Sequence, residues 1–293
     1  MTGGCGFIGR AVVQGLHRAG AEVSVVDQRP YPDASVQSVV GDLCDPSIRD
    51  AAVTPGLAGI VHLAAVTSVL ASIRDPFGTY EGNVAVTAGL LELARERGVG
   101  RFILASTNAV TGNVGAEVIT EDVPLRPLTP YGATKAACEM LLSAYASSYD
   151  LAATAVRLTN VYGPGMSEKD SFVPRLMRAA LAGEGVQVYG DGEQRRDFVF
   201  VEDVVQAVLV AWGRRHSGPL IIGSGRSVTV NELVEETRRA TGAPIPVTRV
   251  PAKPGEMPAV IVSTEQARAL GYRPGVDLPE GLAAVWAYFQ GAG

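Results

Sequence analysis

The run Thr2-Gly3-Gly4-Cys5-Gly6-Phe7-Ile8-Gly9 opens the chain and decides which fold the remaining residues can complete. Its glycines at positions 3, 6 and 9 are evenly spaced, and an apolar run with helical spacing comes next, over residues 11–16. Glycines let a backbone turn tightly and approach a pyrophosphate, which then sits at the N-terminus of the following helix. A glycine triplet alone is also compatible with an ordinary turn before a helix, so its interpretation depends on the strand after that helix.

An acidic residue ends the first predicted strand. The strand covers residues 22–27, and its last residue, Asp27, lies 18 residues after Gly9. A carboxylate at this place accepts both hydroxyls of an adenosine ribose and repels a 2′-phosphate. A solvated aspartate at a strand end is the plainer alternative, but the preceding glycine run favours the ribose role. The pattern predicts NAD rather than NADP, although Arg29 is a residue type that accepts the phosphate.

Strand-like and helical segments alternate through the first half of the chain. Strand-like pieces lie at residues 36–40, 59–63 and 101–105, and a helical pattern covers residues 83–97. This alternation predicts an α/β fold with a doubly wound parallel sheet of the Rossmann type. Ligands bind beyond the carboxyl ends of the strands in such sheets. Asp42 with Leu43, and Leu63 with Ala64 and Ala65, are therefore candidate cofactor contacts.

The glycine run should follow a central strand, yet only Met1 precedes Thr2. Two explanations are open: a short strand lies upstream of the recorded start, or the sheet lacks its middle strand. A sheet without that strand leaves unpaired edges beside a buried gap, which favours a truncated start.

The composition argues against several classes of function. The chain has 293 residues, of which 47% are hydrophobic and 19% charged, as expected for a soluble globular protein of one large or two modest domains. With 25 basic against 30 acidic residues and no basic block, nothing indicates a nucleic-acid partner, and no apolar run is long enough to span a bilayer. The three cysteines and three histidines have neither disulfide nor ligand spacing. No metal site is predicted, and a cytoplasmic location is expected.

A second chemical motif is the run Tyr131-Gly132-Ala133-Thr134-Lys135. Pro130 before it and the apolar periodicity after it predict a helix that begins near Pro130. Tyr131 and Lys135 then share one helical face, about 5–6 Å apart between Cβ atoms. Because a neighbouring cation favours the phenolate, Lys135 is expected to lower the pKa of Tyr131 and make it a usable base. By itself this spacing is common in helices that have no catalytic role.

The order of these motifs resembles the extended short-chain dehydrogenase/reductase superfamily, and within it the nucleotide-sugar epimerases and dehydratases. The glycine run, the acidic strand end, the pair Ser106-Thr107 and the Tyr-x-x-x-Lys helix occur in the order typical of these enzymes. Later stretches extend the resemblance over essentially the whole chain: RLTNVYGP at residues 157–164, YGDGEQRRDF at residues 189–198 and KPGEMPA at residues 253–259.

The resemblance implies a mechanism and a set of cofactor contacts. Tyr131 would take the proton of the sugar 4-hydroxyl while hydride passes from C4 to NAD, Thr107 would hydrogen-bond that hydroxyl, and Lys135 would hold the nicotinamide ribose. In an epimerase the 4-keto sugar then turns over and receives the hydride on its other face. The implied cofactor contacts are Gly3, Gly6, Phe7, Ile8, Gly9, Asp27, Asp42, Leu43, Leu63, Ala64, Ala65, Asn83, Tyr131 and Lys135.

The residues after Thr107 discriminate between reactions within the superfamily. Sugar 4,6-dehydratases carry an acid pair there, in a Ser-Thr-Asp-Glu-Val-Tyr-Gly pattern, and UDP-glucuronate decarboxylases keep the glutamate. This chain has Asn108 and Ala109 instead, and an alanine cannot move a proton. The pattern favours NAD-dependent 4-epimerisation of a UDP-hexose over dehydration or decarboxylation. A 4-keto-sugar reductase and a non-catalytic NAD-binding protein are two more candidates.

From about residue 163 the alternation weakens and proline and glycine become frequent, which predicts a smaller C-terminal substrate-binding lobe. The predicted domains are residues 1–162, which bind NAD, and residues 163–293, which bind the nucleotide sugar and are partly interleaved with the first. By the resemblance, the substrate contacts are Thr107, Asn160, Val173, Tyr189, Arg196, Lys253, Glu256 and Val260. Val260 stands where some relatives have a bulky aromatic residue, which implies room for a larger sugar.

The expected partners come from the same resemblance. The substrate is a nucleotide sugar, a UDP-sugar before others, and neither nucleic acid nor a membrane is expected. Relatives often pair as homodimers through two helices each, which here would be residues 84–97 and 133–147.

Overall fold

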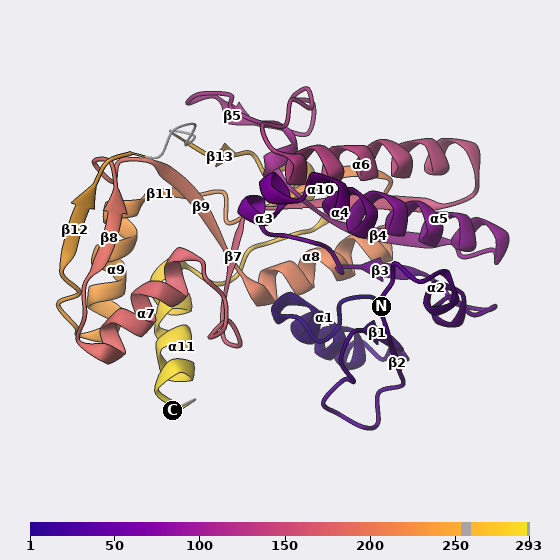
Figure 1. Cartoon of the computed structure of the whole chain (residues 1–293), viewed down its shortest axis with the longest axis horizontal. Helices are drawn as coiled ribbons and strands as arrows, with labels where there is room; N and C mark the ends of the chain where they lie inside the picture. The colour runs from indigo at the N-terminus through magenta and orange to yellow at the C-terminus, as the bar shows by residue number, and fades with distance from the viewer. Residues whose placement is uncertain (253–258, 292–293) are drawn as a thin grey trace.

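The structure, a computed structural model, describes residues 1–252 and 259–291. Figure 1 shows two lobes: a larger one, in which helices flank a parallel sheet, and a smaller one that holds the C-terminal helix. The N-terminus lies within the larger lobe beside strands β1 and β3. The α/β fold with a Rossmann-type sheet, predicted from the alternation of strands and helices, is confirmed.

The main sheet is parallel, and its strands follow a doubly wound order. One pair is β2 (Ser38–Val40) beside β1 (Val25–Asp27), and the remaining strands run β3 (Ile60–His62), β4 (Arg101–Thr107), β6 (Ala152–Leu158) and β10 (Gly218–Ile222). The strands predicted at residues 36–40, 59–63 and 101–105 correspond to β2, β3 and β4.

Residues 1–3 join the two groups of strands. Thr2 forms parallel bridges to Val26 on one side and His62 on the other. The Thr2 N–H donates to the Val61 carbonyl at 3.0 Å, and the Gly3 N–H donates to the Val26 carbonyl at 2.9 Å. The middle position of the sheet, for which the sequence offers no full strand, is therefore occupied by this short segment.

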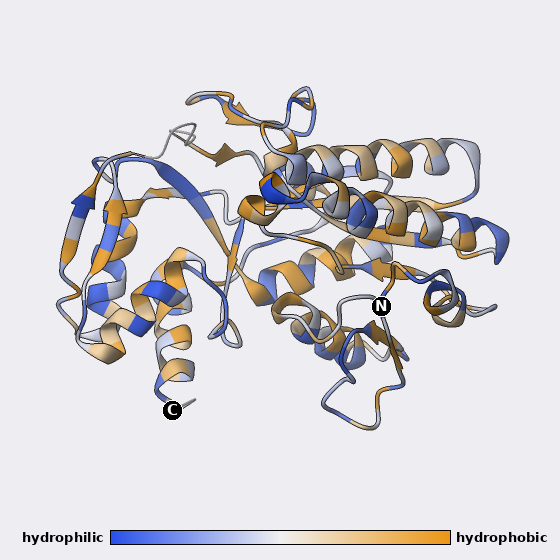
Figure 2. Ribbon diagram, in the orientation of Figure 1, coloured by the Kyte–Doolittle hydropathy of each residue, from blue (hydrophilic) through white to orange (hydrophobic). Residues whose placement is uncertain are grey.

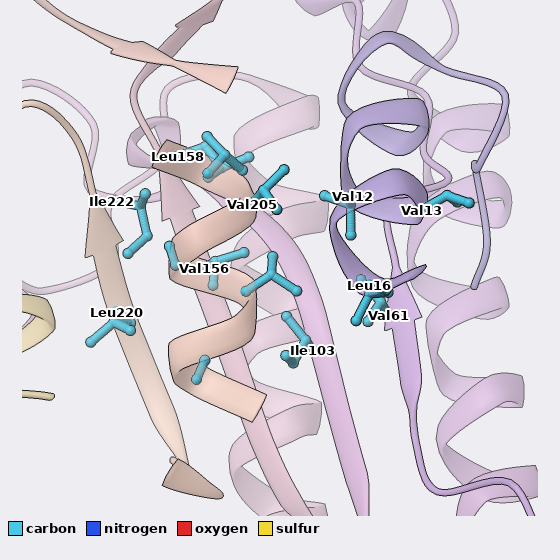
Figure 3. Packing of buried hydrophobic residues seen from close by; sticks show 14 of the residues in the cluster. Val12, Val13, Leu16, Val61, Ile103, Val156, Leu158, Val205, Leu220 and Ile222 are labelled. Atoms are coloured by element: carbon cyan, nitrogen blue, oxygen red, sulfur yellow. The ribbon is translucent and has the colours of Figure 1, made fainter. Parts of the chain in front are cut away.

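Two layers of helices cover the sheet. One face packs on α1 (Phe7–Arg18), α8 (Val201–Arg214) and α10 (Glu265–Leu270), and the other on α2 (Pro46–Ala52), α5 (Val86–Glu96) and α6 (Pro130–Ser148). Side chains alternate along β4, so Ile103 packs with the first layer while Phe102 and Leu104 pack with the second. Figure 3 shows the first of these cores, where α1 and α8 face the strands. In Figure 2 helix α8 is largely hydrophobic, as its position between the sheet and α1 requires.

The segment between β3 and α5 is a chain of short helices. It consists of α3 (Val69–Arg74), α4 (Pro76–Tyr80) and a π-helical turn, η1 (Glu81–Ala85), that leads into α5. Ser68 and Asp75 cap the first two of these helices through their side chains. A short 3-10 turn, η2 (Asn108–Val110), follows β4, and Thr107 caps it.

The smaller lobe has its own core. It is built from α7 (Phe172–Ala182), β8 (Val186–Tyr189), α9 (Val230–Thr241), β12 (Val247–Val250) and α11 (Leu278–Gly291). A second set of strands, β7 (Asn160–Tyr162), β9 (Arg195–Phe200) and β11 (Ser227–Thr229), connects it to the main sheet, and β5 (Val118–Ile119) pairs with β13 (Ile261–Val262). Helix α9 starts with a capping box between Thr229 and Glu232, a signal readable in the sequence.

Segments after residue 162 return to the larger lobe. Strand β10 pairs with β6, and α8 packs against α1. These crossings are the interleaving that the two-domain division allows for, and the boundary at residue 162 stays a proposal.

Candidate active site

A cavity of about 540 Å³ lies where the two lobes meet. The glycine run, the end of β4, the start of α6 and residues of the smaller lobe line it. It therefore opens at the carboxyl ends of the parallel strands, where ligands bind in sheets of this kind.

The glycine run forms a cradle that side chains would fill. Gly3 has a φ of +70°, and a Cβ added there would lie 2.7 Å from the Ala64 nitrogen. A Cβ on Gly9 would overlap the Gly3 carbonyl oxygen. Helix α1 begins at Phe7 behind Gly6, and no side chain caps its first N–H groups. Because uncapped N–H groups at a helix N-terminus bind phosphate, the cradle fits the pyrophosphate of a dinucleotide.

The predicted contacts of the glycine run line the cavity, as do two of the residues after β3. They are Gly3, Gly6, Phe7, Ile8, Gly9, Leu63 and Ala65. Ala64 lies between the last two but does not line the cavity: its side chain packs against the core, and its N–H donates to the Thr2 hydroxyl at 3.2 Å.

Asp27 lies at the end of β1 beside this cradle. One of its carboxylate oxygens accepts from the Cys5 N–H at 3.0 Å, and the other accepts from the Arg29 N–H at 3.3 Å. The glycine run thus fixes the orientation of the carboxylate. Asp27 does not line the cavity itself, so its contact with a ribose stays a prediction.

Three further predicted cofactor residues lie away from the cavity. Asp42 is exposed and accepts from the Cys44 N–H at 2.8 Å, and Leu43 is buried under it. Asn83 is fully buried: its amide oxygen accepts from the Val66 N–H at 2.8 Å, and its amide nitrogen donates to the Thr134 hydroxyl at 3.0 Å. The Asn83 side chain therefore ties the loop after β3 to α6, which leaves no support here for a direct cofactor contact.

Thr107, Tyr131 and Lys135 meet at the floor of the cavity, and all three line it. The Thr107 hydroxyl accepts from the Ala109 N–H at 3.2 Å, which leaves its own proton for the hydrogen bond with the Tyr131 phenol oxygen. The Lys135 ammonium donates to the Ala105 carbonyl at 2.9 Å. Helix α6 begins at Pro130, as predicted, and the Thr129 side chain caps it.

The pKa shifts of Tyr131 and Lys135 differ from those expected from the sequence. Lys135 was expected to lower the pKa of Tyr131, but burial raises the pKa of the Tyr131 phenol, and only the Thr107 hydrogen bond lowers it. Burial also lowers the pKa of the Lys135 ammonium to about 8. The expectation was wrong for this structure because the ammonium donates to a backbone carbonyl and because burial disfavours the charged form of both groups.

The turn after Thr107 carries no acid. Asn108 is buried, and neither its amide nitrogen nor its amide oxygen has a hydrogen-bond partner among the described residues. The Thr111 hydroxyl donates to the Asn108 carbonyl at 2.8 Å. The turn is thus positioned by backbone contacts and offers the cavity no carboxyl group.

Only some of the predicted substrate residues line the cavity. Asn160, Val173, Tyr189 and Arg196 line the cavity, whereas Lys253 and Glu256 lie outside the described residues. Val260 does not line the cavity, because its side chain packs with Ile119, Ile221 and Val262. The hypothesis that Val260 walls the sugar site is therefore not supported.

Sequence reasoning missed much of the smaller lobe's contribution. Lys169 and Arg175 line the cavity from the segment around the start of α7, and Arg175 forms a bidentate ion pair with Asp170 at 2.7 Å. Additional lining residues that were not predicted include Ser171, Gln187, Gln194 and Phe198. Their only sequence signal is proximity to Val173, Tyr189 and Arg196, which is too weak to select them among exposed polar residues.

Across residues 1–252 and 259–291, no helix combines the length and apolarity needed to span a membrane. The same residues contain no group of three or more histidine, cysteine or acidic side chains arranged to hold a metal ion.

Comparisons with known proteins show the family of this chain. The model of the NAD dependent epimerase/dehydratase family matches residues 1–223. A UDP-glucose 4-epimerase of Thermus thermophilus, solved with NAD, is 33% identical over 99% of this chain and 98% of its own, with a TM-score of 0.91. MoeE5, solved with UDP-glucuronic acid and NAD, is 38% identical over the same shares, also with a TM-score of 0.91. A dTDP-glucose 4,6-dehydratase of Streptomyces griseus is 34% identical over 99% of this chain and 93% of its own.

Proposed function

This chain belongs to the NAD-dependent epimerase/dehydratase family, and we propose that within it the protein is a 4-epimerase of a UDP-hexose. One observation carries the proposal: Thr107, Tyr131 and Lys135 meet in the cavity while positions 108 and 109 hold no acid. NAD is its cofactor, and the family makes it an enzyme that acts on nucleotide sugars.

The proton chemistry can be assigned from the described contacts. NAD, when bound, supplies the hydride acceptor and a positive charge that favours a nearby phenolate. Tyr131 removes the proton from the sugar 4-hydroxyl and later returns it. Thr107 donates to the phenol oxygen and so stabilises the phenolate form. Lys135, anchored on the Ala105 carbonyl, keeps its ammonium beside the cofactor site.

Epimerisation is favoured because it needs no second proton-transfer group. A 4,6-elimination removes a proton from C5 and a hydroxyl from C6, so it requires an acid and a base next to the sugar. Asn108 and Ala109 provide neither. The second candidate is nevertheless dehydration, since relatives 33–34% identical are named dTDP-glucose 4,6-dehydratases.

Cationic side chains support a nucleoside diphosphate substrate. Lys169, Arg175 and Arg196 all line the cavity from the smaller lobe. Charge-assisted hydrogen bonds to phosphate are stronger than neutral ones, and two phosphates need several such donors. UDP is the proposed nucleotide because solved relatives hold UDP-glucose and UDP-glucuronic acid.

The test compares four substrates in parallel. The purified protein is incubated with UDP-glucose, UDP-glucuronic acid, UDP-N-acetylglucosamine or dTDP-glucose, and the sugars are followed by proton NMR. We expect at least one UDP-sugar to equilibrate with its 4-epimer without added reductant. The matched control is Tyr131→Phe, which keeps the ring but cannot transfer a proton. A 4-keto-6-deoxy product, or no 4-epimer from any of the four substrates despite bound NAD, would refute the proposal.

We also propose that the protein pairs with a second copy of itself. Large apolar side chains are exposed on neighbouring helices α3, α4 and α6, and we name them the α3–α4 patch: Leu70 (71% exposed), Ile73 (57%), Phe77 (68%), Tyr80 (48%) and Met140 (67%). Exposed apolar side chains gathered on neighbouring helices favour an interaction site. Light scattering should give the mass of a dimer, and Phe77→Glu should give that of a monomer. Leu181→Glu on α7, which alters an exposed leucine outside the patch, should leave the dimer intact.

A further inference from the structure

Polar side chains of helix α6 contact the last residues of strand β4. Three side chains of the helix, spaced four residues apart, meet three consecutive residues of the strand: Tyr131 meets Thr107, Lys135 meets Ala105 and Glu139 meets Ser106. The first two contacts belong to the proposed catalytic group. In the third contact Ser106 lines the cavity, whereas Glu139 does not.

Glu139 is held from two strands at once. The Ser106 hydroxyl donates to one Glu139 carboxylate oxygen. The Arg157 guanidinium donates to the carboxylate at 2.8 Å and 3.1 Å, and both partners are buried, with side chains 7% and 3% exposed. Ser106 and Arg157 are register partners on β4 and β6, so their side chains leave the same face of the sheet.

The Glu139–Ser106 contact has a geometric consequence for the catalytic residues. Ser106 lies between Ala105 and Thr107 on β4, so an anchor on the Ser106 side chain holds the strand segment that carries the other two contacts. A buried carboxylate paired with Arg157 is well suited to this role, because moving it would leave a charge unpaired in the core.

We infer that Glu139 is a positioning residue, which through Ser106 sets the register of α6 on β4 and so holds Tyr131 against Thr107 and Lys135 against Ala105. The inference deepens the proposed function and rests on it for the catalytic role of Tyr131. Glu139 touches neither cavity nor substrate; it acts through the end of β4.

The contact at Thr107 provides a specific readout. Only that hydrogen bond lowers the pKa of the Tyr131 phenol, against the effect of burial. If β4 loses its anchor on Glu139, Thr107 should move and the pKa of Tyr131 should rise further. The charged and titratable groups around the contact remain in place when Ser106 alone is changed: Lys135, Cys138 and Glu139 on α6, His62 on β3 and Arg157 on β6.

The experiment uses Ser106→Ala, which removes one hydroxyl and leaves the Glu139–Arg157 pair intact. Tyrosine labelled with ¹³C at Cζ is titrated by NMR, with the Tyr131 signal assigned from Tyr131→Phe. We expect the midpoint of Tyr131 to rise by about one pH unit. In the same variant, kcat for the best substrate should fall by roughly 10–100-fold, as a slight misplacement of reacting groups does, while KM stays within about twofold.

Two further variants separate positioning from general destabilisation. Ser106→Thr keeps a hydroxyl on the same atom and should restore both the titration and most of kcat. Thr237→Val removes another buried hydroxyl, which donates to the Leu233 carbonyl at 2.8 Å in the smaller lobe. It should lower stability without changing kcat or the Tyr131 midpoint.

The outcomes are distinct. An unchanged Tyr131 midpoint in Ser106→Ala overturns the inference whether or not kcat falls, because positioning requires the Thr107 contact to loosen. If the titration midpoint of Tyr131 rises but kcat stays within twofold of the unchanged protein, the claim that this positioning supports catalysis is overturned. If the unchanged protein converts no nucleotide sugar, the proposed function fails, while the titration still decides whether Glu139 holds the register.

Discussion

Two parts of the same cavity are built in different ways. The proposed catalytic part, around Tyr131 and Lys135, comes from one helix and one strand of the main sheet, and its contacts reach into the buried core. The substrate part, around Lys169 and Arg175, comes from the smaller lobe, where both cationic side chains are exposed. The proposed catalytic part is therefore held by contacts inside the core, whereas the proposed substrate part is held at the surface, for example by the ion pair of Arg175 with Asp170.

The largest effect should come from breaking the catalytic part. Tyr131→Phe removes the only proton-transfer group that the mechanism assigns, so kcat should fall by about 10²–10⁴-fold, the usual range for a general base. The fold and NAD binding should persist, because the ring remains and the Tyr131 N–H still donates to the Ser72 hydroxyl at 3.1 Å. Steady-state kinetics and NAD content measure both effects. Retained turnover would remove Tyr131 as the base.

The next effect concerns stability. Burial lowers the pKa of Lys135 from 10.5 to about 8, so between these values the unfolded chain binds more protons and stability rises with pH. Below about pH 8 the buried ammonium destabilises the fold, by up to about 3 kcal/mol. Lys135→Met should therefore raise the free energy of unfolding at pH 7.

Urea unfolding at several pH values measures the difference between the two proteins. The advantage of Lys135→Met should shrink between about pH 8 and pH 10.5 as the wild-type lysine loses its proton. A difference that does not depend on pH would show that the lysine is not desolvated. Catalysis should be impaired in Lys135→Met, so that at this position a gain in stability comes with a loss of activity.

A smaller effect should separate two cations of the substrate part. Arg196 is half-buried on β9, and its replacement by alanine should raise KM about 10–100-fold through the loss of charge-assisted hydrogen bonds. Lys169 is exposed, so Lys169→Ala should change KM less than about fivefold. Initial-rate kinetics with the best UDP-sugar measure both, with Arg239→Ala on exposed α9 as a control. Equal increases in KM for the two variants would contradict the distinction between the half-buried arginine and the exposed lysine.

The smallest effect concerns the one polar group of the catalytic part that the described residues leave unpaired. The Asn108 amide is buried without a partner, so Asn108→Leu, of similar volume, should leave stability unchanged or raise it by about 1 kcal/mol. Thr237→Val, which breaks a formed hydrogen bond, should lower it by about the same amount. Denaturant unfolding measures both. A clear loss of stability in Asn108→Leu would show that the amide has a partner in solution, such as bound water.

The fold could be predicted from short-range patterns. The glycine run, the alternation of strands and helices, and Pro130 before the Tyr-x-x-x-Lys run each act within a few residues, so they survive in the sequence as spacing. The central position of the sheet could not be read in this way. The backbone hydrogen bonds of residues 1–3 to β1 and β3, which are distant in sequence, show that a short segment occupies it.

Site residues could be predicted from the sequence where the chemistry requires a particular residue type. Their burial and hydrogen-bond partners, which depend on packing, could not. Thr107, Tyr131 and Lys135 line the cavity as expected, but the Lys135 ammonium donates to a carbonyl, and the pKa of Tyr131 is raised by burial. Asn83 has a type suited to a ligand, yet its amide joins Val66 to Thr134. Burial and partner choice depend on neighbours that are distant in sequence.

The sequence by itself determined the Rossmann-type fold, and it placed the proposed NAD-binding cradle and the proposed catalytic trio, because each depends on residue types at fixed short spacings. Only the tertiary structure decided that Glu139, Ser106 and Arg157 lock α6 onto β4, and that Lys169 and Arg175 face the cavity. Those relations join residues that are far apart in the chain. They exist only after the strands have paired in register and the smaller lobe has closed over the carboxyl ends of the sheet.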